Sequence, residues 1–79
     1  PEVLPLPSTL EIEVRQELKT IAQTPPYESV QIVHMGEKIL DHCLGYETPY
    51  RETAERIRQF VCSNHTQNIP GLIEETLRN

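Results

Sequence analysis

The chain has 79 residues and a formal net charge of −5, which together limit its fold and its partners. A chain this short forms one domain, because two halves would be too small to bury separate cores. The acidic balance argues against nucleic acid as a partner, since proteins that bind phosphate backbones display a basic patch. No apolar run approaches the roughly 20 residues needed to cross a membrane, so the sequence predicts a cytoplasmic protein without membrane contact.

The folded domain is predicted to begin at Ser8. Residues 1–7 contain three prolines and are expected to form an extended arm or linker, which leaves residues 8–79 as a single helical domain. Ser8 and Glu11 have the spacing of a capping box, in which each side chain satisfies a free backbone N–H group of the first helical turn. A first helix is therefore predicted over residues 8–23. One face of it is apolar (Leu10, Val14, Leu18 and Ile21), while Ile12 points to roughly the opposite side.

Proline and glycine positions set the boundaries of the second helix. The run from Thr24 to Pro26 ends the first helix and begins the next, because proline cannot continue a hydrogen-bond ladder but fits the first turn of a helix. Gly45 has the residue type that favours the left-handed conformation after a helix end. The second helix is therefore predicted over residues 26–44.

Two further helices are predicted after this point. Thr48 and Pro49 form a second cap-plus-proline signal, so a third helix is expected over residues 49–63. Its inner face is predicted to contain Tyr50, Ala54, Ile57, Phe60 and Val61. A short fourth helix is expected over residues 70–78, after a polar loop. The sequence thus predicts an all-α fold, a small bundle of about four helices around a central second helix.

The second helix has an unusually large apolar surface. One apolar side contains Tyr27, Val30, Val33, Leu40 and Leu44, and another contains Ile32, Met35, Ile39 and Cys43. Only a narrow wedge is polar, with Gln31, His34, Lys38, Asp41 and His42. Such a helix is either the central member of its own bundle or has one face reserved for a second chain.

These features favour a non-enzymatic protein–protein interaction module, of adaptor or regulatory type and with the capacity to self-associate. The predicted partner-binding residues are the outward side chain of the first helix and one face of the second, where a glycine would permit close approach of another helix: Ile12, Ile32, Met35, Gly36, Ile39 and Cys43. The alternative is a small helix-turn-helix DNA-binding regulator, because a turn at residues 45–49 precedes three arginines (Arg51, Arg56 and Arg58).

No metal site, cofactor or catalytic residue is predicted. His42, Cys43, Cys62 and His65 are possible zinc ligands by type, but an antiparallel hairpin of the second and third helices would separate the two thiols by more than about 10 Å. The same separation excludes a disulfide between them. Cys62 follows Arg58 by one turn and is the best nucleophile candidate, yet no third group that would complete a catalytic set is apparent.

Overall fold

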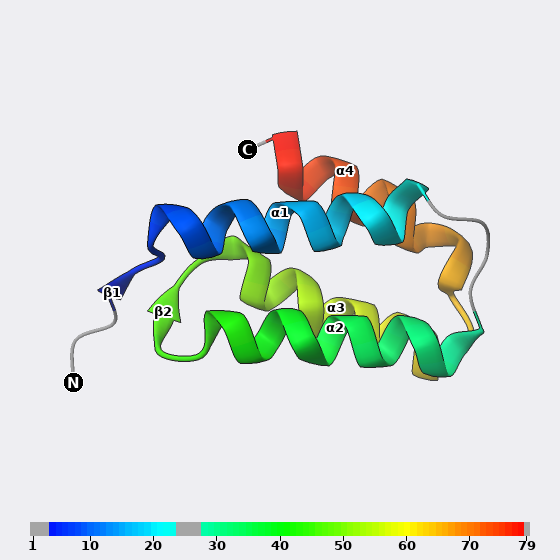
Figure 1. The fold of residues 1–79 in the computed structure, drawn as a ribbon. Coiled ribbons are helices and arrows are strands. Elements are labelled where there is room, and N and C mark those ends of the chain that lie inside the picture. Colours follow the sequence, from blue (N-terminus) through cyan, green and yellow to red (C-terminus); the bar gives the residue numbers. More distant parts are fainter. Residues whose placement is uncertain (1–3, 24–27, 79) are drawn as a thin grey trace.

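The computed structural model describes residues 4–23 and 28–78 and consists of four helices with a very short two-stranded pairing at one end (Figure 1). The helices are α1 (Ser8–Gln23), α2 (Ser29–Cys43), α3 (Pro49–Cys62) and α4 (Ile69–Arg78), and a 3₁₀ turn, η1 (Thr66–Asn68), runs into α4. The two strands are β1 (Leu4–Pro5) and β2 (Tyr46–Glu47). The predicted all-α fold with four helices is confirmed.

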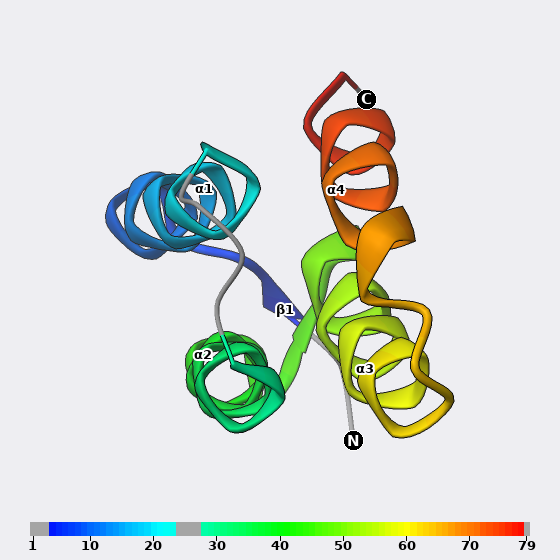
Figure 2. The same ribbon diagram turned by 90° about the vertical axis from the view of Figure 1, so that its right-hand side faces the viewer.

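The helices alternate in direction and form a ring rather than enclosing one of their number. Figure 2 shows α1 beside α2 on one side of the bundle and α4 beside α3 on the other. The most extensive packing is between α2 and α3, and the remaining major contacts join α1 to α4, α1 to α2, and α3 to α4. In this arrangement α2 packs mainly against two neighbours, which differs from a bundle built around a central second helix.

Local capping interactions define the ends of α2 and α3. The backbone N–H of Glu28, which precedes α2, donates to the side-chain carbonyl of Gln31 at 3.3 Å. Gly45 follows the end of α2 with a φ of 85°, a left-handed conformation that glycine adopts without a steric penalty. The Thr48 hydroxyl accepts a hydrogen bond from the Tyr50 N–H at 3.3 Å, as the cap-plus-proline signal predicts. The expected start of this second helix at Pro26 lies outside the described residues, and α2 itself begins at Ser29.

The start of α1 differs from the prediction in its hydrogen bonding. The Glu11 N–H donates to the Pro7 carbonyl at 2.9 Å, so the helix begins at Ser8 itself. The carboxylate of Glu11, predicted to cap the first turn together with Ser8, instead accepts a hydrogen bond from the Tyr50 hydroxyl of α3 at 3.2 Å. A tertiary contact therefore replaces the expected local one.

The strand pairing is a feature that the sequence did not predict. β1 and β2 are parallel, with Leu4 opposite Tyr46 and Pro5 opposite Glu47. This pairing fixes the described part of the proline-rich arm against the connection between α2 and α3. Hydrophobic periodicity cannot reveal a pairing of two residues, because two positions do not establish a period of two.

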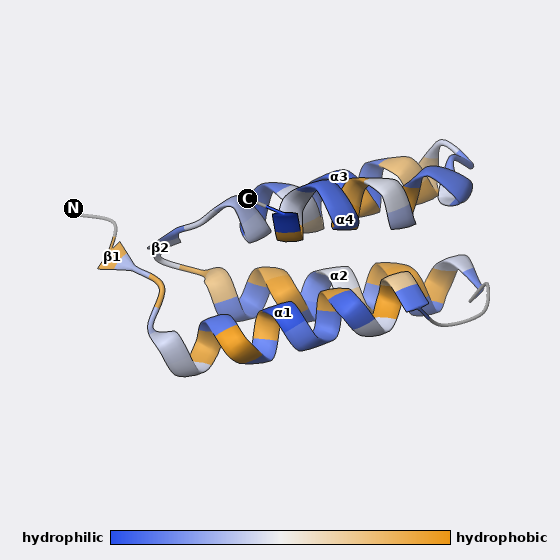
Figure 3. Cartoon of the chain, turned by 90° about the horizontal axis from the view of Figure 1, so that it is seen from above, coloured by the Kyte–Doolittle hydropathy of each residue, from blue (hydrophilic) through white to orange (hydrophobic). Residues whose placement is uncertain are grey.

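An aliphatic core lies between the four helices. The largest of its fully buried side chains come from every helix: Val14, Leu18, Ile39, Cys43, Ile57, Ile69 and Ile73. Figure 3 shows apolar and polar segments alternating along the helices, as expected where each helix buries one side. Ile12 is 58% exposed, so the prediction that it points away from the buried face of the first helix is confirmed. In the described part of the chain, no helix has the length and apolar character that a membrane span requires.

Two buried threonines link α3 to α4 within this core. Their hydroxyl oxygens, on Thr53 and Thr76, lie 2.7 Å apart, and Thr76 also lies 2.9 Å from the Leu72 carbonyl. Thr53 Oγ1 also lies 3.1 Å from the Pro49 carbonyl. Because a hydroxyl has one proton to donate, one threonine donates to the other, and the second donates to the carbonyl four residues before it. This chain of hydrogen bonds allows two polar side chains to be buried between the helices.

Candidate partner-binding surface

Four of the six predicted partner-binding residues belong to the core. Ile32, Gly36, Ile39 and Cys43 are all buried, and together they form the inward side of α2. A Cβ atom placed on Gly36 would lie 3.5 Å from the Ala54 carbonyl oxygen and 3.5 Å from the Ile57 side chain. The close approach expected at this glycine is therefore made by α3 of the same chain. This corrects the placement of the four residues on an exposed docking face.

The contact at Gly36 leads to a stability prediction. Distances of 3.5 Å are ordinary van der Waals contacts, so an alanine methyl group fits between α2 and α3 without displacing either helix. Alanine also loses less backbone entropy than glycine when a helix forms. We expect Gly36→Ala to stabilise the domain by up to about 1 kcal/mol, measured as a higher urea midpoint. A lower midpoint would show that the two helices cannot accommodate a methyl group here.

The other two predicted residues remain accessible, but they do not form one surface. Met35 is half-buried on α2, where it packs against the edge of the core. Ile12 lies on the outward side of α1. Single exposed apolar side chains are common on protein surfaces, so Ile12 alone does not define a binding site.

The two cysteines have opposite environments. Both are free thiols, with Cys43 buried and Cys62 exposed at opposite ends of the antiparallel pair α2 and α3. Burial raises the pKa of the Cys43 thiol, and the Glu17 carboxylate also raises it, while the Arg51 guanidinium acts in the other direction. Within residues 4–23 and 28–78, no three His, Cys, Asp or Glu side chains gather in a way that could hold a metal ion.

The raised pKa of Cys43 makes stability dependent on alkaline pH. The unfolded chain releases the thiol proton near pH 8.5, whereas the folded protein, in which the pKa of Cys43 is raised, retains it to a higher pH. The contribution of the protonated thiol is therefore complete below that pH and is lost as the pH rises above it. We expect the free energy of unfolding to fall more steeply between about pH 8 and pH 10 in the wild type than in Cys43→Ala. Equal slopes in urea titrations would contradict this expectation.

Two residues of the predicted polar wedge of α2 contact α1 rather than solvent alone. Lys38 Nζ lies 3.1 Å from Glu17 Oε1, and His42 Nε2 lies 3.6 Å from the same oxygen. The other carboxylate oxygen of Glu17 is buried without a hydrogen-bond partner. His34, by contrast, is exposed. The wedge is thus divided between a contact with α1 and a free outer surface.

A second polar cluster joins α1, α3 and α4. The Arg15 guanidinium donates to the Tyr50 hydroxyl at 2.9 Å and to the Leu77 carbonyl at 3.2 Å. The Tyr50 hydroxyl also donates to Glu11. All three side chains of this cluster are used in holding helices together, so their polar groups are occupied by structural contacts.

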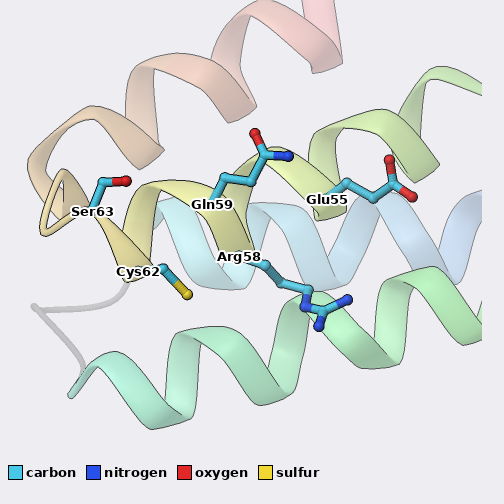
Figure 4. Close-up of a pocket in the computed structure, with 5 residues that line it drawn as sticks. All are labelled: Glu55, Arg58, Gln59, Cys62 and Ser63. Carbon is cyan, nitrogen blue, oxygen red and sulfur yellow. The ribbon is translucent and has the colours of Figure 1, made fainter.

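The hollow shown in Figure 4 has a lining that is polar and apolar in equal parts, formed by α3 and the residue that follows it. Its residues are Glu55, Arg58, Gln59, Cys62 and Ser63. Cys62 and Arg58 both point toward α2, where Arg58 Nε lies 3.8 Å from Glu37 Oε1. No histidine is among the described residues that line this hollow.

The largest departure from the predicted site lies on the outer side of α2. Val30 and Leu44 are each 69% exposed, at the beginning and just after the end of this helix. Between them His34, Glu37 and Asp41 are also exposed. We call these five residues, Val30, His34, Glu37, Asp41 and Leu44, the outer stripe. A shallow hollow at its first end is mainly apolar and is lined by Val30, Gln31, His34 and Met35.

The outer stripe could have been found in the sequence from the spacing of its residues. Dividing the apolar residues of the second helix into two faces did not use this spacing. The five residues follow one another at spacings of four, three, four and three. At about 100° per residue, this spacing keeps them within a narrow arc of the helix surface. Grouping Val30 and Leu44 with Val33 and Leu40 concealed the arc, because it joined the two exposed residues to half-buried ones.

Comparison with known proteins adds no assignment. The chain matches no protein-family model, no curated protein and no solved structure.

Proposed function

We propose that this domain is a non-enzymatic protein–protein interaction module, of adaptor or regulatory type, that binds its partner through the outer stripe of α2. The observation that supports the proposal is the exposure of Val30 and Leu44, two large apolar side chains on the outside of one helix. Burying such side chains against a partner contributes roughly 1.5–3 kcal/mol each. The polar residues between them supply the hydrogen-bonding groups that fix the orientation of a bound chain.

A helical docking surface suits this part of the molecule for a second reason. The inward side of α2 is held by α1 and α3, so its outer side is presented on a rigid support. A preorganised surface loses little conformational entropy when a partner binds. Both thiols are free, which is consistent with a cytoplasmic location for the module.

Site-specific photo-crosslinking tests this function. A photoreactive amino acid replaces Val30 in one variant and Lys19, on the exposed side of α1, in a matched control. In an extract of the source cells, the probe at position 30 is expected to form a covalent adduct with a polypeptide, whether another protein or a second copy of this chain. Absence of an adduct at position 30, or equal adducts at both positions, would contradict the proposal.

Geometry and charge both disfavour the DNA-binding alternative. A helix-turn-helix motif joins its two helices at roughly 90–120°, whereas α2 and α3 run antiparallel along their length. Two of the three arginines after the turn lie near carboxylates, with Arg56 3.5 Å from Glu52 and Arg58 3.8 Å from Glu37. We therefore propose a single function.

A further inference from the structure

The outer stripe has the spacing of a helix-pairing surface. Residues repeated at intervals of four and three form the seam along which two helices pack in a coiled coil. In α2 this seam has apolar residues at its two ends, Val30 and Leu44, and polar residues at its three inner positions. A seam with a polar centre pairs weakly, but its polar residues determine which register is favoured.

Turning a second copy of α2 through a two-fold axis between residues 37 and 38 places complementary groups opposite one another. An antiparallel pair in this register matches residues whose numbers sum to 75, because each residue rises about 1.5 Å along the axis. His34 of one copy then lies level with Asp41 of the other, on the facing sides of the two helices. Lys38 lies level with Glu37 of the other copy, but its ammonium group is 3.1 Å from Glu17 of its own chain. The contact between His34 and Asp41 occurs twice, as an isologous interface requires.

The apolar ends of the stripe also meet in this register. Val30 of one copy lies within one residue's rise of Leu44 of the other, a difference of about 1.5 Å along the axis. Leu44 of the second copy thereby reaches the mainly apolar hollow lined by Val30, Gln31, His34 and Met35. Val30 and Leu44, each 69% exposed in the single chain, would become buried together at each end.

From these placements we infer that the partner of the outer stripe is a second copy of this chain, packed antiparallel along α2 in a symmetric dimer. The inference depends on the proposed interaction function and names its partner. Self-complementarity is the argument for a second copy, because the His34 imidazole of each copy faces the Asp41 carboxylate of the other, and the exposed apolar ends of the two stripes meet. The two Glu37 carboxylates approach near the axis, where Arg58 of the same chain, 3.8 Å from each Glu37, offsets their repulsion.

A pair of charge-changing variants tests this register directly. In a dimer of the His34→Glu variant, the carboxylate at position 34 would face the Asp41 carboxylate of the other copy and repel it. In a dimer of Asp41→Lys, the side chain at position 41 would face His34 and lose the contact of the native pair. Each variant is therefore expected to dimerise less well with itself. In a mixed dimer, Glu at position 34 of one chain faces Lys at position 41 of the other, and the remaining contact is native. Side chains at both positions are exposed, and neither takes part in a side-chain hydrogen bond or ion pair among residues 4–23 and 28–78.

The measurement is sedimentation equilibrium of the whole chain. The salt concentration is about 0.15 M, at which charges more than about 8 Å apart are screened. Protein concentrations extend to about 1 mM, so that weak association is detected. We expect concentration-dependent dimers in the wild type, weakening by about tenfold or more in each variant, and restored dimers in an equimolar mixture of the two. Glu13→Lys on α1 has the same charge change as Asp41→Lys and is expected to dimerise like the wild type. Circular dichroism checks that the variants are folded, and Val30→Asp provides a further variant on the same stripe.

The outcomes separate this inference from the proposed function. A wild type that stays monomeric at every concentration overturns the second copy as partner, and a position-30 adduct with a different polypeptide would then leave the interaction function standing. Wild-type dimers that both charge variants retain would place the contact elsewhere and overturn the outer stripe as the dimer surface. Monomers together with no adduct at position 30 contradict both proposals.

Discussion

Replacing Ile39 by Glu is expected to unfold the domain. The Ile39 side chain is completely buried in the core between the helices. A carboxylate at this position would either be buried without a partner or force the helices apart, and an unpaired buried charge costs several kcal/mol. Small domains are stable by only about 5–15 kcal/mol, so we expect loss of most helical circular dichroism at 25 °C.

Val30→Glu is the matched control, because it places the same carboxylate on the same helix. Val30 is 69% exposed, so the substitution is expected to leave the helical signal unchanged and to shift the thermal midpoint by only a few degrees, within about 0.5 kcal/mol. It should nevertheless remove the position-30 binding proposed above. A folded Ile39→Glu protein with a wild-type midpoint would mean that the inward side of α2 is not the core.

Ile73→Ala is expected to have the second-largest effect. Ile73 is completely buried, on the short helix α4 that packs against both α1 and α3. Removing its side chain beyond the β-carbon loses apolar burial and leaves a cavity, which together cost about 2–5 kcal/mol. The loss should appear as a lower urea midpoint with an unchanged slope of the transition.

Leu4→Ala is the appropriate comparison for Ile73→Ala. Leu4 is 57% exposed on β1, so its truncation is expected to change the free energy of unfolding by less than about 0.5 kcal/mol. If the two variants had equal urea midpoints, α4 would contribute nothing to the core beyond what the arm contributes.

The helices could be predicted because their signals are local. Thr48 and Pro49 fix the start of α3, and Gly45 fixes the end of α2, through contacts within a few residues. The buried side of α1 follows in the same way from one apolar stripe opposite a lone Ile12. Each of these features depends on neighbours in the sequence, which the amino-acid order specifies directly.

The orientation of α2 could not be predicted on the same basis. Both of its apolar sides satisfy the helical period, and only the positions of α1 and α3 decide which side is buried. Gly36 was the available clue, since a glycine in a helix interior is often kept for close packing. The structure places it against Ala54 and Ile57 of α3, and this contact identifies the inward side.

Contacts between distant side chains were equally beyond local patterns. Glu11 and Tyr50 are separated by 39 residues, and no spacing rule relates them. Lys38 and His42 form part of a polar wedge in the sequence, but only the position of α1 brings Glu17 between them. The sequence therefore identified the helix that contains the candidate site, but not which side of that helix is exposed.

The hydrogen bond from Arg15 to the Leu77 carbonyl spans 62 residues of sequence and joins the first helix to the last. The most extensive packing, between α2 and α3, is instead closed by a short connection. Closing a short loop costs less entropy than closing a long one, and local contacts form faster than distant ones. The central hairpin is therefore expected to be formed in the folding transition state, with φ-values near 0.5–0.8, while contacts between the two terminal helices appear only after the barrier has been crossed.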